Sequence, residues 1–323
     1  VVAAIERAAA RGVVVRGLFD AKFHKTYPQT IDRLAKSANV TTRLLDLKSI
    51  TGGVLHAKYF VVDALVTFLG SQNLDWRSLE HIQELGVLVD SAAVAAAFRE
   101  AFELDWRIAG GEARAESNSR AADGFPLRSG DGASAFTITP VYSPAALAPD
   151  PRLWDLPRIV ALIDGAKTTV RVQLLTYRMT NRDGTYFEEL ENALRRAAAR
   201  GAKVQLLMAD WCMRKGTIEG LQALEPLANV EVKLVTIPQD PAGFVPFARV
   251  IHSKYLAVDG RAAWIGTSNW EKDYFEESRN VGLVIEGGPV PSRLDAYFQD
   301  GWNGPYAKAV DPCATYTAPR IGE

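Results

Sequence analysis

The stretch His56-Ala57-Lys58-Tyr59-Phe60-Val61-Val62-Asp63 returns later in the chain as His252-Ser253-Lys254-Tyr255-Leu256-Ala257-Val258-Asp259. Both copies open with His-x-Lys, continue with an apolar run and close on Asp. After six further residues each copy has a Gly, followed three positions later by Asn73 in one copy and Asn269 in the other. Repetition of so many specified positions is not a coincidence. The chain therefore consists of two related lobes.

A second repeat supports this division. The run Ala-Ala-Ala-Arg-Gly occurs at residues 8–12 and again at residues 197–201. Each copy closes a helical pattern at a Gly, and an apolar run follows at residues 13–19 and at residues 204–208. Helix, Gly stop and buried strand together predict an α/β unit in each lobe.

The segment between the lobes is rich in Gly, Ala, Ser and Pro. We therefore assign residues 1–110 to the first lobe, 111–150 to a linker with one strand at 135–138, and 151–323 to the second lobe. The second lobe has a helix and strand at residues 159–173 that the first lobe lacks, and Val1 falls inside a helical pattern. We expect the first lobe to be incomplete at its N-terminus, so that a targeting segment would be lost with the missing part.

Composition excludes several classes of protein. The 323 residues are 48% hydrophobic and 23% charged, and the formal net charge is −1, which argues against a broadly basic surface that coats duplex nucleic acid. No run approaches the roughly 18 consecutive apolar residues of a membrane helix, so we expect no integral membrane segment in this chain. Cys212 and Cys313 are too few for a disulfide framework and lack the spacing of zinc ligands.

The chemistry of the repeated motif suggests phosphate handling. Side chains alternate along a strand, so the His and Lys of each motif project to one face and Asp63 and Asp259 to the other. An imidazole can attack phosphorus or transfer protons near neutral pH, while an ammonium beside it holds negative charge. The two Asp are therefore predicted to support the site or a turn rather than to touch substrate.

Each motif is followed by a strand that returns antiparallel, at residues 65–69 and 262–265. These strands deliver the loops Gly70-Ser71-Gln72-Asn73 and Gly266-Thr267-Ser268-Asn269. Hydroxyls, amides and backbone N–H groups of such loops can bind phosphate oxygens. We assign phosphate binding to Ser71 and Ser268.

A single His-x-Lys would ordinarily have only a structural role at the surface or in the core. Its duplication is what favours a functional role. The chain has four His, two of which occupy the motifs. For the other two, His24 and His81, we expect solvent-facing or local structural roles.

The pattern His-x-Lys, four residues, Asp, six residues, Gly, present twice, resembles the signature of the phospholipase D superfamily. Flanking sequence is similar to the branch of animal phospholipases D three and four, which act as 5′ exonucleases on single-stranded nucleic acid. In the first lobe this similarity is carried by residues 53–58, 75–79 and 84–87. In the second it is carried by Tyr255 and residues 265–270, 273–275 and 302–306.

The resemblance implies a fold and a mechanism. Each lobe would be a mixed sheet flanked by helices, and the two lobes would be related by a pseudo-twofold axis with the active site at their interface. One His would form a phosphohistidine while the other protonates the leaving oxygen and then activates water. The motif Lys and Asn residues would stabilise charge on the phosphoryl oxygens, without a metal or other cofactor.

Glu84 lies 28 residues after His56, where the superfamily places a carboxylate against the catalytic imidazole, and Asn280 lies at the same offset after His252. A carboxylate fixes the tautomer of its partner and stabilises the cation, whereas an amide only orients it. We therefore predict Glu84 to hold His56 as nucleophile, with His252 as acid and base. Glu276 and Glu277 are alternative carboxylates for the second lobe.

Three features leave alternatives open. Glu271 and Lys272 depart from the branch pattern and would add charge near the cleft. Trp76 and Trp270 follow the two Asn loops, where they would either pack in the core or stack on bases. The substrate would be single-stranded nucleic acid or, alternatively, a phospholipid; an inactive scaffold is disfavoured because both motifs are intact.

Overall fold

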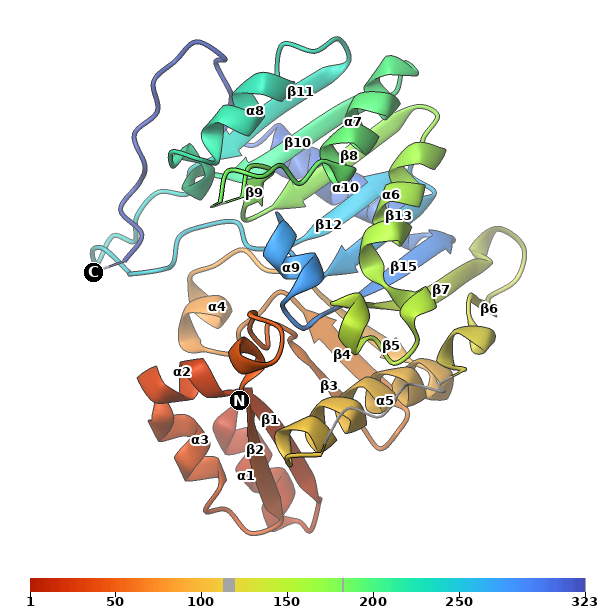
Figure 1. The fold of residues 1–323 in the computed structure, drawn as a ribbon, viewed down its shortest axis with the longest axis vertical. Helices are drawn as coiled ribbons and strands as arrows, with labels where there is room; N and C mark the ends of the chain where they lie inside the picture. The colour runs from red at the N-terminus through yellow and green to blue at the C-terminus, as the bar shows by residue number, and fades with distance from the viewer. Residues whose placement is uncertain (113–119, 182, 323) are drawn as a thin grey trace.

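The computed structural model describes residues 1–112, 120–181 and 183–322. The first lobe is drawn in red to yellow in Figure 1, and its longest helix is α5 Ala92–Ala109. Its helices are α1 Val2–Ala10, α2 Ala21–Thr26, α3 Pro28–Leu34, α4 Trp76–Glu80 and α5 Ala92–Ala109, and its strands are β1 Val15–Asp20, β2 Val40–Leu45, β3 Tyr59–Val62, β4 Val66–Gly70 and β5 Gly86–Asp90.

The second lobe is larger and contains most of the sheet. Its helices are α6 Asp155–Gly165, α7 Glu189–Ala199, α8 Ile218–Leu224, α9 Lys272–Glu276 and α10 Val290–Trp302. Its strands are β8 Thr169–Leu174, β9 Tyr177–Arg178, β10 Lys203–Ala209, β11 Val230–Val235, β12 Tyr255–Val258, β13 Ala262–Gly266, β14 Trp270–Glu271, β15 Asn280–Gly287 and β16 Ala307–Ala309. The helix and strand predicted at residues 159–173 correspond to α6 and β8.

With β6 Leu127–Ser129 and β7 Phe136–Ser143 between the two lobes in sequence, nine strands form one mixed sheet in the order β16-β11-β10-β8-β12-β13-β15-β7-β6. Strands β8, β10 and β11 are parallel, and the strands from β12 to β6 pair antiparallel. The predicted antiparallel return after each motif is confirmed, because β3 pairs with β4 and β12 with β13. The α/β class with two related lobes is likewise confirmed.

The lobes differ in how their strands connect. In the second lobe β8 pairs with both β10 and β12 and so joins the two halves of the sheet. In the described part of the first lobe, β1 and β2 form a parallel pair while β3, β4 and β5 form a separate antiparallel sheet. The prediction of one mixed sheet per lobe is therefore met by the second lobe, whereas the first divides its strands between two sheets.

The segment predicted as a linker contributes to the second lobe. Strands β6 Leu127–Ser129 and β7 Phe136–Ser143 lie in it, and β7 pairs with β15 along its full length. The strand predicted at residues 135–138 is thus longer and starts one residue later. Residues 113–119 of the predicted linker, and residues 182 and 323 of the predicted second lobe, lie outside the described residues.

Both Ala-rich helices end as the sequence pattern indicates. Gly12 follows α1 with φ +95° and Gly201 follows α7 with φ +93°. Glycine adopts this left-handed conformation at little cost, and it ends a helix by turning the chain. Each Gly therefore directs the chain into a strand, β1 in one lobe and β10 in the other.

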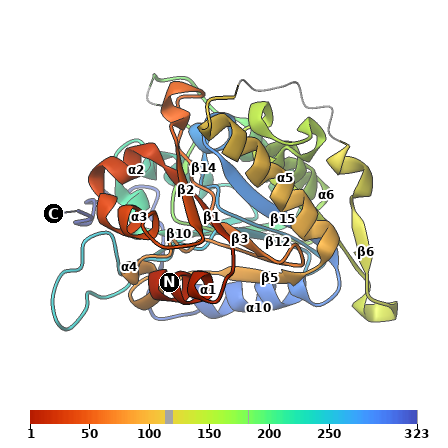
Figure 2. The same cartoon turned by 90° about the horizontal axis from the view of Figure 1, so that it is seen from below.

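Alternate residues of the central strands serve two different cores. On β12, Leu256 and Val258 pack with α6, α7 and α8 on one face. Tyr255 and Ala257 pack with α10 and with α5 of the first lobe on the other face. Figure 2 shows α6 and α10 on opposite sides of the sheet. The second core includes side chains of both lobes and so fixes their relative position, which positions the two motifs against each other.

Candidate active site

The two His-x-Lys motifs lie where the lobes meet. His56 and Lys58 directly precede β3, and His252 and Lys254 directly precede β12, in extended segments outside the strands. Each of these segments forms hydrogen bonds with the opposite lobe. The His56 N–H donates to the Arg279 carbonyl at 2.9 Å, and the His252 N–H donates to the Gln83 carbonyl at 2.8 Å. This reciprocal exchange fixes both imidazoles at the interface.

The motif lysines share one arrangement. Each ammonium donates a hydrogen bond to the backbone carbonyl of the His in its own motif. Lys58 is 9% exposed and Lys254 is 1% exposed. Each lysine side chain therefore folds back onto the backbone of its own motif.

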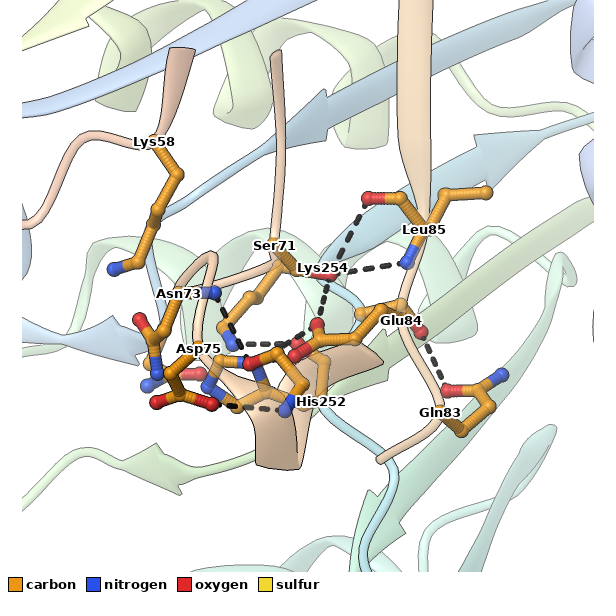
Figure 3. Close-up of polar contacts among 12 residues, drawn as sticks. Lys58, Ser71, Asn73, Asp75, Gln83, Glu84, Leu85, His252 and Lys254 are labelled. Atoms are coloured by element: carbon orange, nitrogen blue, oxygen red, sulfur yellow. Dashed lines mark hydrogen bonds and ion pairs between the residues drawn. The ribbon is translucent and has the colours of Figure 1, made fainter. Parts of the chain in front are cut away.

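Glu84 holds His252, and not His56 as predicted from its position in the sequence. Its carboxylate oxygens lie 2.9 and 3.0 Å from Nδ1 of His252, a contact that Figure 3 shows directly. The prediction was wrong because Glu84 precedes β5 at the lobe interface, where the segment Gln83–Glu84 runs beside the other lobe's motif. The alternative carboxylates are not the partners of His252, since Glu276 pairs with Lys272, Glu277 is half-buried, and Nδ1 of His252 lies against Glu84.

Asn280 holds His56 in the mirror-image arrangement. Its Oδ1 lies 2.9 Å from Nδ1 of His56, and its amide nitrogen donates to the carbonyls of Tyr274 and Ser278. Because the amide donors are used elsewhere, Oδ1 faces the imidazole and Nδ1 of His56 carries the proton. Each motif imidazole is therefore held at Nδ1 by a side chain of the opposite lobe.

The two hydroxyls assigned to phosphate binding have other partners. The Ser71 hydroxyl donates to Glu84, and Ser71 is only 2% exposed. Its counterpart in the second lobe is Thr267, whose hydroxyl donates to Asn280 Oδ1 at 2.9 Å. Ser268 is fully buried and donates to Asp155 at 3.1 Å. The hydroxyls of Ser71 and Thr267 thus orient the groups behind the imidazoles, and the hydroxyl of Ser268 is engaged by Asp155, so their side chains have partners within the protein other than the phosphate predicted for Ser71 and Ser268.

The two loop asparagines differ in their surroundings. Asn269 is 1% exposed, and its Oδ1 accepts from the Thr176 N–H at 3.4 Å. Tyr274 hydrogen-bonds the Asn269 side chain through its hydroxyl and places its ring edge-on to His56, with 4.9 Å between ring centroids. Asn73 is exposed, and its backbone N–H donates to the Ser78 hydroxyl at 3.1 Å. Tyr274 is the contact that sequence reasoning missed.

Both motif aspartates lie at turns. Asp63 and Asp259 have φ of +51° and +54°, at the ends of β3 and β12 away from the imidazoles. The Asp259 carboxylate accepts hydrogen bonds of 2.8 Å from the backbone N–H groups of Lys167, Thr168 and Thr169. It therefore fastens β12 to the start of β8.

The electrostatics of the site favour an anionic ligand. Burial, reinforced by the charges of Lys58 and Lys254, holds the pKa of His56 well below its usual value. Burial and Lys254 likewise lower the pKa of Lys58, and burial lowers the pKa of Lys254 to about 7 although Glu84 opposes the shift. These mutual effects place the four basic groups within electrostatic reach of one another. A phosphodiester anion among them would relieve the repulsion.

Glu84 and His252 form a coupled pair. Burial and Lys254 lower the pKa of His252 to about 4, against the opposing effect of Glu84. Burial would raise the pKa of Glu84, but the hydrogen bond from His252 and the nearby Lys254 outweigh it and lower the pKa. Glu84 is thus a carboxylate that accepts a hydrogen bond from Nδ1–H of a neutral imidazole. In this tautomer Nε2 of His252 carries a lone pair.

The structure places three of the flanking residues. Trp270 is fully buried, whereas Trp76 is 50% exposed. Glu271 accepts a hydrogen bond from Thr176 and pairs with Arg178, so its charge is compensated.

Two further findings concern the remaining histidines and metals. His24 contacts Asp32 at 2.9 Å and His81 lies 3.4 Å from Asp240, which are the local roles expected of them. Within the described ranges, no group of three or more His, Cys, Asp or Glu side chains is arranged to hold a metal ion, and no helix is long and apolar enough to cross a membrane.

Comparison with known protein families identifies the family of this chain. A family model described as "Cardiolipin synthase, PLD-like domain" matches residues 1–106 and 159–302, that is, both lobes. The chain belongs to this phospholipase D-like family, and it is an enzyme of the phosphodiesterase class.

Individual relatives refine the comparison. The chain is 31% identical over 335 aligned residues to the protein named 5'-3' exonuclease PLD3 of Macaca fascicularis, covering 96% of this chain and 67% of the relative. It is 31% identical over 324 residues to Phospholipase D Z of Dictyostelium discoideum, covering 95% and 76%. Among solved structures, the phosphatidylserine synthase of Haemophilus influenzae matches 96% of this chain and 85% of its own with a TM-score of 0.58 at 12% identity, which concerns the fold alone. The branch inferred from flanking sequence is thus confirmed.

Proposed function

We propose that this enzyme cleaves single-stranded nucleic acid as a 5′ exonuclease, through a phosphohistidine and without a metal ion. The observation that carries the proposal is the pair of imidazoles held at Nδ1, by Glu84 and by Asn280, beside two buried lysines. Support for the substrate comes from the relatives named as 5'-3' exonucleases.

His252 is the nucleophile in this scheme. Its Nε2 attacks phosphorus, the bond from phosphorus to the leaving oxygen breaks, and that oxygen keeps the electron pair. The phosphorylated imidazole retains Nδ1–H and carries a positive charge, which the Glu84 carboxylate at 2.9 Å stabilises. The earlier reasoning from sequence gave this role to His56 only because it paired Glu84 with His56, so the same logic now selects His252.

His56 acts first as acid and then as base. A phosphodiester bound beside Lys58 and Lys254 offsets the charges that lower the pKa of His56, so in the complex the ring is an imidazolium and gives its Nε2 proton to the leaving oxygen. A carboxylate would hinder this transfer by stabilising the cation, whereas the neutral Asn280 amide orients the ring without doing so. The neutral imidazole then takes a proton from water as the water oxygen attacks phosphorus and the bond to His252 breaks.

The lysines and asparagines balance the charge that builds on the phosphoryl oxygens. A bound phosphate can draw the ammonium groups of Lys58 and Lys254 away from their own backbone carbonyls. Asn269 is held in place by Thr176 and Tyr274, which prepares its amide for a phosphoryl oxygen. We expect activity to survive chelation, since these groups supply the electrostatic stabilisation.

A paired assay tests the proposal. The protein is incubated in EDTA with a 5′-labelled single-stranded oligonucleotide and, separately, with phosphatidylcholine vesicles. We expect stepwise release of nucleotides from the 5′ end, absent in the His252→Ala variant. The similarity to Phospholipase D Z makes lipid the second candidate. Hydrolysis of the vesicles alone would establish lipid as the substrate and reject the nuclease proposal, and loss of activity in EDTA with recovery in magnesium would reject the mechanism.

A further inference from the structure

Trp76 follows the loop of the first motif. It is the first residue of α4, three positions after Asn73, and 50% of its surface is exposed. The Asp75 carboxylate caps this short helix by accepting from the Ser78 N–H at 2.9 Å, and the Ser78 hydroxyl accepts from the Asn73 N–H. The loop that carries Asn73 and the helix that carries Trp76 are thus one hydrogen-bonded unit, at the boundary between the lobes in Figure 1.

The indole is also connected to the second motif. Its ring meets His81 edge-on, with 5.4 Å between centroids and 89° between the planes. The His81 carbonyl accepts from the Arg249 N–H at 2.9 Å, three residues before His252. Trp76 therefore lies between the loop of one motif and the chain entering the other, in a fixed orientation.

The surroundings of the ring fit a base and its phosphate. The Arg77 guanidinium lies 5.1 Å from the Trp76 centroid, and no acidic side chain of the described residues pairs with it. An exposed indole leaves apolar surface in water, which stacking on a base would cover. By contrast, Trp270, after the other Asn loop, is fully buried.

We propose that Trp76, with Arg77 beside it, is a nucleobase-stacking subsite adjacent to the scissile phosphate. The inference rests on the proposed nuclease function and specifies how the strand is held. A flat ring accepts any base, so the subsite favours unpaired strands without selecting sequence. Trp76 and Leu79 are exposed neighbours on α4, but this helix has only five residues, two of them Arg77 and Glu80, and is far shorter than the amphipathic helices that bind bilayers.

Abasic substrates test this subsite. The values of kcat/KM are measured for wild type, Trp76→Ala and Trp76→Phe on a single-stranded oligonucleotide and on versions in which the first or second 5′ nucleotide lacks its base. Tyr186→Ala, which removes a similarly exposed aromatic ring in the second lobe, is the matched control. Melting temperatures establish that each variant is folded.

We expect Trp76→Ala to lose about 5- to 150-fold on the complete oligonucleotide, in line with the loss of one stacked base. On one of the two abasic substrates its loss should be under about twofold, and Trp76→Phe should recover part of the activity. Equal losses on all substrates, or none, would overturn the inference, as would a loss seen only on phosphatidylcholine vesicles. Failure of the wild-type protein to cleave any oligonucleotide would instead refute the proposed function.

Discussion

Replacing Glu84 by Gln removes one charge from the site while keeping the shape of the side chain. In the native protein its oxygens lie 2.9 and 3.0 Å from Nδ1 of His252, and the two side chains are only 5% and 9% exposed. A buried hydrogen bond to a charged group contributes about 1.5–3 kcal/mol. If that stabilisation develops as the imidazole becomes phosphorylated, Glu84→Gln should slow phosphoenzyme formation by about 10- to 150-fold.

Rapid mixing with a p-nitrophenyl phosphodiester measures this step, because the first turnover releases p-nitrophenol as the phosphoenzyme forms. The leaving group needs no protonation, so the role of His56 as acid does not limit the burst. Glu80→Gln is the matched control. It makes the same substitution at an exposed position of α4 and should behave as wild type. A burst rate within twofold of wild type in Glu84→Gln would refute the reasoning, and so would a normal burst followed by slow hydrolysis alone.

Three further predictions concern pH, positioning and stability. On the oligonucleotide the kcat/KM profile should fall below about pH 4, where the nucleophile His252 takes up a proton, and its alkaline limb, where the acid His56 loses its proton, should lie at lower pH than for an ordinary imidazole, because burial and the two lysines lower the pKa of His56. Lys58→Gln removes one of these charges and should move that limb to higher pH. Tyr274→Phe keeps the ring against the imidazole but removes its hydroxyl, so kcat should fall about 2- to 10-fold with an unchanged melting temperature. Asp105→Ala leaves the buried Arg279 without its partner and should cost about 3–5 kcal/mol in urea unfolding; a loss under 1 kcal/mol would contradict this last expectation.

The sequence predicted the repeated elements well because their signals are local. The Ala-rich helices, their Gly stops and the strands after each motif depend on a few neighbouring residues, and all were confirmed in the structure. The position of β6 and β7 was harder, since these strands belong to a sheet only through the distant β15. Composition indicated a connection, whereas long-range pairing places the strands β6 and β7 of this segment in the sheet of the second lobe.

Contacts between the lobes at the site were also beyond what the sequence could predict. Offsets along the chain identified Glu84 and Asn280 as equivalent positions, yet each contacts the imidazole of the other lobe. Sequence spacing is identical whether a side chain faces its own motif or the symmetry-related one, so only the structure could decide. The role of Thr267 was hidden for a different reason. A hydroxyl that orients a buried amide looks in sequence like one that binds phosphate.

The most direct test of the central claim is to locate the phosphoryl group on the enzyme. The His56→Ala protein is mixed with a p-nitrophenyl phosphodiester, quenched, and analysed by peptide mass spectrometry. We expect an adduct on His252 that accumulates, because the base for water attack is absent, and no adduct in the His252→Ala protein. An adduct on His56 in the His252→Ala protein, with none on His252 in the His56→Ala protein, would contradict it.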